Sequence, residues 1–158
     1  MFLNNFKLKP KIHLRYILQS AISIEDQGVK FYSILAEKTS NTAINRLCSK
    51  LANEEAAHKK IFQNSLLQWK GLPASEEILD SITAQLKNIG LFWDLSLSKA
   101  SEKDFIKYAI EQEIKTADFY LSFEKTFPQT WKQLYIQQLV ITERAHANSL
   151  TSLLESLK

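Results

Sequence analysis

Two stretches of this sequence, 88 residues apart, carry the same pair of metal-binding side-chain types. Glu55 and His58 form one Glu-x-x-His motif, and Glu143 and His146 form the other. Residues three apart on an α-helix lie about one turn apart on the same face. Each motif therefore predicts a carboxylate and an imidazole that bind one metal ion together.

The same offset of 88 residues relates two further glutamates, each of which follows an apolar pattern. An Ala-Ile-x-x-Glu stretch ends at Glu25 in the first half of the chain and at Glu113 in the second. A carboxylate buried on an apolar helix face without a partner is costly. We therefore expect Glu25 and Glu113 to join the two Glu-x-x-His motifs in one site.

The elements that must position these residues are four long helices, and we expect no strand. Apolar residues spaced three and four apart predict helices over about residues 12–38, 43–69, 101–127 and 130–158. Asn41 lies among the polar residues that precede the second helix, and Ser101-x-x-Asp104 resembles a capping box for the third. Gly71 and Pro73 are expected to end the second helix.

The predicted fold class is all-α, a four-helix bundle built from two helical hairpins. Residues 1–10 are expected to form an irregular N-terminal arm, and residues 11–158 the bundle, with half-repeats over about 12–70 and 100–158. Residues 75–98 are long enough to cross the bundle from end to end, and a short helix is expected within them.

Composition excludes several classes of protein. The net charge of +3 comes from basic residues scattered among 17 acidic ones, so we expect no nucleic-acid partner. The single cysteine, Cys48, excludes an internal disulfide and a four-cysteine metal site. No apolar run reaches the ~18 residues of a membrane helix, and no signal peptide is evident, so we expect a cytoplasmic protein.

A pseudo-two-fold axis relating the two halves would bring six ligands to the centre of the bundle. Four carboxylates neutralise two divalent cations, and each cation receives one imidazole. Oxygen and imidazole ligands without thiolates suit iron or manganese better than structural zinc. The expected metal ligands are Glu25, Glu55, His58, Glu113, Glu143 and His146.

The doubled pattern, Ala-Ile-x-x-Glu-x-x-x-x-x-Phe-Tyr and then Glu-x-x-His, resembles the rubrerythrin-like branch of the ferritin-like superfamily. The resemblance implies a ferritin-like four-helix bundle with two iron ions bound by the six residues named above, manganese or a mixed pair being alternatives. It also implies an oxidoreductase that reduces hydrogen peroxide or dioxygen, serves in oxidative stress, and forms a homodimer.

Two departures from the family qualify these expectations. Many rubrerythrins carry a rubredoxin domain, for which this chain has too few cysteines, so we expect electrons from a separate donor such as a rubredoxin. Peroxidase members commonly place an extra Glu where this chain has Thr116. The resulting site is more symmetric and closer to that of ferritin-like ferroxidases.

Several alternatives remain open at this stage. The site is also compatible with a ferroxidase or iron-handling protein, a di-iron monooxygenase, or a metal-free helical interaction module. Tyr32 and Tyr120 lie two turns after Glu25 and Glu113, where each is either a catalytic group near the metals or a plain core aromatic. Glu54 is expected to be solvated, although the residue beside a ligand sometimes supports a ligand histidine.

Overall fold

The computed structural model describes residues 10–70, 84, 86, 90–91, 100–122 and 135–157 of the 158-residue chain. These residues include four long helices, α1 (Pro10–Lys38), α2 (Thr42–Lys70), α4 (Glu102–Ser122) and α6 (Gln137–Ser156). No strand occurs in this part of the chain. The all-α fold class predicted from the sequence is confirmed.

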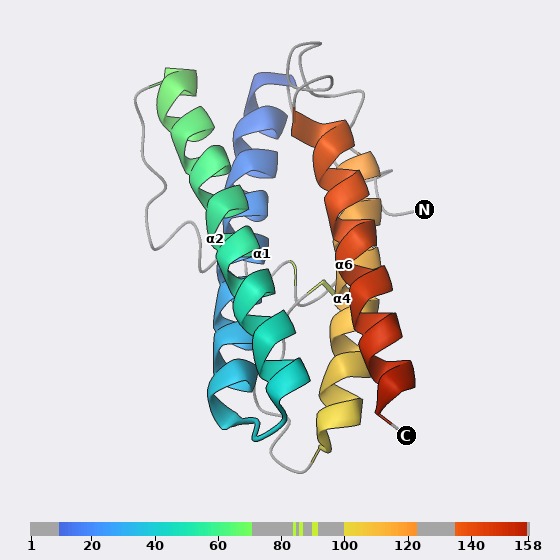
Figure 1. The fold of residues 1–158 in the computed structure, drawn as a ribbon. Coiled ribbons are helices and arrows are strands. Elements are labelled where there is room, and N and C mark those ends of the chain that lie inside the picture. The colour runs from blue at the N-terminus through green and yellow to red at the C-terminus, as the bar shows by residue number, and fades with distance from the viewer. Residues whose placement is uncertain are drawn as a thin grey trace.

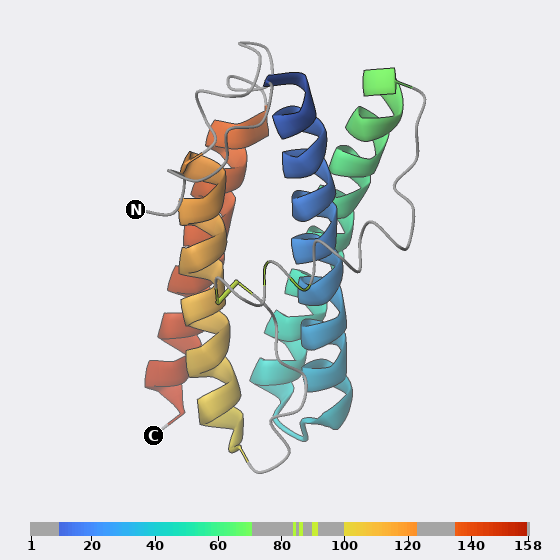
Figure 2. The same cartoon turned by 180° about the vertical axis from the view of Figure 1, so that it is seen from behind.

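The four helices form two antiparallel hairpins that lie side by side (Figure 1). Helix α1 packs against α2, and α4 packs against α6. Helix α2 ends at one end of the bundle and α4 begins at the other, as the view from behind also shows (Figure 2). The connection between the hairpins must therefore span the length of the bundle, as predicted.

Local hydrogen bonds explain where two of the helices begin. The side chain of Asn41 accepts hydrogen bonds from the backbone amides of Ala43 and Ile44, at 2.9 and 3.1 Å, and so caps α2. Before α4, the amide of Ser101 donates to the Asp104 carboxylate at 3.0 Å, and the amide of Asp104 donates to the Ser101 hydroxyl at 3.2 Å. These reciprocal bonds form the predicted capping box.

Two apolar clusters fill the bundle, one toward each end. The first contains residues of α1, α2, α4 and α6 and the residue before α6: Ile17, Leu18, Ala21, Ile22, Phe62, Leu66, Ala117, Tyr120, Ile136, Leu139 and Val140. The second draws on the same four helices: Phe31, Tyr32, Leu35, Ala36, Ile44, Cys48, Leu51, Ile106, Ala109 and Leu150. In each helix the residues expected to bind metal lie between these two groups in sequence, which places the candidate site between two apolar layers.

One core prediction was wrong. Tyr135 was expected on the inward face of the fourth helix, but its side chain is 36% exposed. The next residue, Ile136, is fully buried, and adjacent residues on a helix point about 100° apart. The two side chains therefore cannot share the inward face.

Other predictions fall partly or wholly on residues outside the described ranges. These are the N-terminal arm, the C-terminal turns of the third helix, the start of the fourth near residue 130, and most of the crossover. Within the crossover, Ala84 and Leu86 are helical, and Leu86 and Leu91 pack against Ile24 of α1. Among the described helices, none is long and apolar enough to cross a membrane.

Candidate metal centre

Each helix delivers its predicted polar residues to the middle of the bundle. Glu25 comes from α1 and Glu113 from α4, while α2 and α6 each supply a Glu-x-x-His pair. All four carboxylates are buried, with relative exposures from 0% for Glu25 to 3% for Glu55. The structure therefore brings together all six residues that the sequence singled out.

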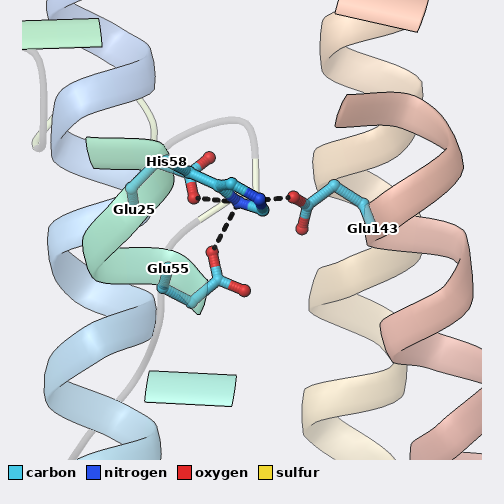
Figure 3. A group of neighbouring side chains, drawn as sticks. All are labelled: Glu25, Glu55, His58 and Glu143. Atoms are coloured by element: carbon cyan, nitrogen blue, oxygen red, sulfur yellow. Dashed lines mark hydrogen bonds and ion pairs between the residues drawn. The ribbon is translucent and has the colours of Figure 1, made fainter. Parts of the chain in front are cut away.

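The six side chains form two overlapping groups that share two carboxylates. Glu25, Glu55, His58 and Glu143 offer ligand atoms that all lie within 4.8 Å of one another (Figure 3). A second group with the same property consists of Glu55, Glu113, Glu143 and His146. Glu55 and Glu143 belong to both groups, so they are positioned to bridge two cations.

The contacts of the two histidines repeat each other across the site. Nδ1 of His58 lies 3.2 Å from Glu143 and 3.3 Å from Glu25, and Nδ1 of His146 lies 3.0 Å from Glu55 and 3.5 Å from Glu113. The two imidazole rings are stacked, with centroids 5.9 Å apart and planes 18° apart. The pseudo-two-fold symmetry expected from the repeat is thus present in the arrangement of the side chains.

Two tyrosines cross between the hairpins and contact the outer carboxylates. The hydroxyl of Tyr32 on α1 donates a hydrogen bond to Glu113 on α4, and that of Tyr120 on α4 donates to Glu25 on α1. Burial and the charge of the partner glutamate raise the pKa of both phenols well above the ordinary value. Both hydroxyls therefore keep their protons and serve as donors.

A glycine makes room for one of the shared carboxylates. A Cβ atom added to Gly28 would lie 3.2 Å from Cγ of Glu55, which is closer than most real Cβ contacts. Gly28 follows Glu25 by one turn of α1, so its missing side chain leaves Glu55 the space to reach toward Glu25. The equivalent position in the second half of the chain is Thr116, which is buried.

The four carboxylates fall into two electrostatic types, because burial acts to raise the pKa of all four but contacts lower the pKa of two of them. Burial and the charge of Glu55 raise the pKa of Glu25 to about 8. Burial and the charges of Glu55 and Glu143 raise the pKa of Glu113 well above its ordinary value. Burial also acts to raise the pKa of Glu55 and Glu143, but close contacts with the histidines and neighbouring carboxyls outweigh it and lower both.

The two histidines supply positive charge that balances the negative charge of the carboxylates. Burial lowers the pKa of His58, but contacts with Glu143, Glu25 and Glu55 outweigh this effect and raise it to about 12. The pKa of His146 is raised in the same way by its contacts with the facing carboxylates. Two protonated histidines, two neutral carboxyls and two carboxylates sum to zero charge, as do four carboxylates with two divalent cations. Protons and metal ions are therefore alternative ways to balance this cluster.

Buried atoms without hydrogen bonds support the metal interpretation. Oε1 of Glu55, Oε1 of Glu143 and Nδ1 of His146 are buried and have no partner in hydrogen-bonding geometry. Leaving such groups unsatisfied costs about 1–3 kcal/mol each. A cation bound by these atoms would remove that cost, and the donor set of oxygen and imidazole suits iron or manganese. The buried cluster fits a di-iron site.

One supporting residue was not assigned from the sequence. Glu54 was expected to face solvent, yet Oε2 of Glu54 lies 3.0 Å from Nε2 of His146. Its side chain is 37% exposed, so it reaches the histidine from the edge of the bundle. The signal available in the sequence was its position, one residue before the ligand Glu55, but that position alone did not distinguish a supporting role from a solvated one.

Comparison with known proteins agrees with the site. The family model described as Rubrerythrin matches residues 16–89, a stretch that holds most of α1, all of α2 and three of the six candidate metal ligands. No curated protein and no solved structure gave a match. The second half of the site, on α4 and α6, is therefore supported by the repeat and by the geometry above.

Proposed function

We propose that this rubrerythrin-like chain with a ferritin-like four-helix bundle is a di-iron oxidoreductase that reduces hydrogen peroxide. The observation that carries the proposal is the sharing of Glu55 and Glu143 by two buried ligand groups, because two shared carboxylates hold two cations close together. The rubrerythrin match favours iron over manganese or a mixed pair as the bound metal.

In this proposal the ligands divide into shared and terminal ones. Glu55 and Glu143 would be shared by the two metal positions. Glu25 and His58 would complete the first position, and Glu113 and His146 the second. Each position keeps few protein ligands, which leaves room for a small oxidant such as hydrogen peroxide or dioxygen.

Two ferrous ions bound here would supply two electrons, which together with two protons reduce hydrogen peroxide to two molecules of water. The residues of the chain hold that pair and exclude bulk water, since the site lies between two apolar clusters. Tyr32 and Tyr120 hold the terminal carboxylates through their hydroxyl protons. We propose that they also act as catalytic groups, because each phenol is positioned to supply toward the site one of the two protons that this reduction consumes.

The remaining parts of the proposal concern partners. The chain has one cysteine, so a four-cysteine iron site cannot return the electrons from within it. A separate donor such as a rubredoxin is the proposed reductant, and the proposed setting is a cytoplasmic homodimer that removes peroxide during oxidative stress. These points rest on the resemblance to rubrerythrins.

A ferroxidase is the second candidate, and a specific observation favours it. Gly28 and Thr116 occupy the positions one turn after the two terminal glutamates, and neither carries a carboxylate. Neither position adds a carboxylate, so each half of the site supplies two glutamates from equivalent positions. Such a symmetric site is closer to that of ferritin-like ferroxidases, which oxidise ferrous iron with dioxygen.

The rates at which hydrogen peroxide and dioxygen oxidise the iron-loaded protein distinguish these functions. Protein loaded anaerobically with ferrous iron is mixed with equal concentrations of hydrogen peroxide or dioxygen, and the near-ultraviolet absorbance is followed by stopped flow. The peroxidase proposal predicts faster oxidation by peroxide and repeated peroxide consumption when reduced rubredoxin is supplied. Faster oxidation by dioxygen with release of ferric iron would favour the ferroxidase, and oxidation of an added organic substrate would favour a monooxygenase.

A further inference from the structure

The symmetry of the site breaks at the residue that precedes each shared glutamate. Glu54 precedes Glu55, whereas Thr142 precedes Glu143. All six metal-binding side chains are otherwise repeated with the same types and similar contacts. A difference between the two metal positions must therefore come from residues around the ligands.

Glu54 holds the outer side of one ligand histidine. Its Oε2 lies 3.0 Å from Nε2 of His146, while Nδ1 of the same ring lies 3.0 Å from Oε1 of Glu55. The His146 ring is thus contacted at both nitrogens. Lys50 lies 3.8 Å from the other oxygen of Glu54, one helical turn away, so the histidine is the closer partner of this carboxylate.

The histidine of the other half has no such support among the described residues. Within the part of the chain that the structure describes, the ion pairs and hydrogen bond of His58 all run through Nδ1, toward Glu25, Glu55 and Glu143. The hydroxyl of Thr142, which stands where Glu54 stands in the repeat, donates to the carbonyl of Gln138 at 2.9 Å. The side chain of His58 is also more exposed than that of His146, at 12% against 5%.

A carboxylate on the outer nitrogen of a ligand histidine places the proton on that nitrogen and leaves the inner nitrogen free to bind metal. It also fixes the orientation of the ring, and loss of such a partner typically lowers metal affinity by about 10–100-fold. We propose that Glu54 makes the position formed by Glu113 and His146 the tighter of the two, so that this position fills first. The inference rests on the proposed dimetal function and adds an order of loading to it.

Titration with cobalt(II) tests this order, because its visible absorption reports each bound ion without redox chemistry. Apoprotein is titrated in competition with a chelator. Wild type should bind two ions in two steps whose affinities differ by about 10–100-fold. Glu54→Thr should weaken the tighter step until the two merge, and Glu54→Gln should lie between, since its amide oxygen still accepts the hydrogen bond.

The repeat offers a gain-of-function variant. Thr142→Glu should strengthen the weaker step, and the double variant Glu54→Thr/Thr142→Glu should reverse the order of loading. The terminal-ligand variants Glu25→Ala and Glu113→Ala assign the steps, because only Glu113→Ala should remove the tighter one. Glu111→Thr removes an exposed acid of α4 and should change neither step.

The outcomes separate this inference from the function on which it rests. Two ions bound with equal affinity in wild type, and unchanged in Glu54→Thr, would overturn the proposed order and leave the dimetal function standing. No tight binding in wild type would overturn the dimetal function itself. Circular dichroism of each variant establishes that the helices are retained, so that a lost step reports on the site.

Discussion

Among the single residues of the site, the four carboxylates differ in how many ligand groups each belongs to. Glu55 and Glu143 belong to both ligand groups, whereas Glu25 and Glu113 belong to one group each. Each terminal glutamate also accepts a hydrogen bond from a tyrosine of the other hairpin. Removal of a shared carboxylate should therefore affect both ions, and removal of a terminal one should affect mainly its own.

Glu55→Ala should abolish tight binding of both metal ions, whereas Glu25→Ala should leave about one ion per chain. The reason is that the Glu55 carboxylate lies within reach of both positions. Elemental analysis after gel filtration measures the retained metal, with Glu37→Ala, an exposed acid of α1, as the control. Retention of both ions by Glu55→Ala would sink the assignment of Glu55 as a shared ligand.

Metal affinity should rise steeply with pH. The pKa values of Glu25, Glu113, His58 and His146 are all raised, so protons compete with metal ions for these four groups. All four must lose a proton to bind metal, so loading of both positions should release about four protons. Calorimetry in buffers of different ionisation enthalpy counts them, and release of none would contradict the charge balance described for the site.

At the scale of the elements, most of the architecture could be predicted from the sequence. Apolar periodicity placed the first two helices within about two residues of their observed bounds at each end, 10–38 and 42–70. The clustering of the six candidate ligands could be predicted because buried carboxylates on apolar faces require partners, and because the repeat named the same positions twice.

Features that depend on the distance between helices could not be predicted in this way. Sharing of Glu55 and Glu143 follows from how closely α2 and α6 approach. The contact of Glu54 with His146 crosses between the same two helices, 92 residues apart in the chain. Tyr135 was misassigned because it is adjacent to the buried Ile136, and adjacent residues on a helix point about 100° apart, so the two cannot both face the core.

Helix α2 carries both a shared glutamate and a histidine, so the hydrogen bonds that cap its N-terminus stabilise an element that positions the site. Asn41→Ala should lower the free energy of unfolding by about 1 kcal/mol, because the amides of Ala43 and Ile44 lose their acceptor. Urea denaturation of the apoprotein measures the change. Asn53→Ala, on the exposed face of the same helix, should leave stability unchanged or slightly higher; an equal loss in both variants would contradict the capping role.

At the scale of the whole molecule, the site joins two hairpins that each contain one half of the repeat. Its contacts run between α2 and α6 through the histidines and between α1 and α4 through the tyrosines. The polar cluster therefore acts as the central connection of the bundle, with an apolar layer on either side.

Tyr32→Phe and Tyr120→Phe should each destabilise the protein by about 1–3 kcal/mol, because each leaves a buried carboxyl without its donor. The reciprocal positions predict similar losses for the two variants. Thermal unfolding measures them, and the rate of peroxide reduction by the iron-loaded variants tests the proposed catalytic role. Unchanged stability in both would show that the hydroxyls do not connect the hairpins.

We infer that this bundle binds two metal ions through shared carboxylates. The most direct test of this inference is anaerobic titration of the apoprotein with ferrous iron, followed by removal of free metal and elemental analysis. A paired site with shared carboxylates predicts about two irons per chain, reduced to fewer than one by Glu55→Ala. A single iron would contradict the paired site. Binding of no iron would mean that the repeated glutamates and histidines contact one another without binding metal.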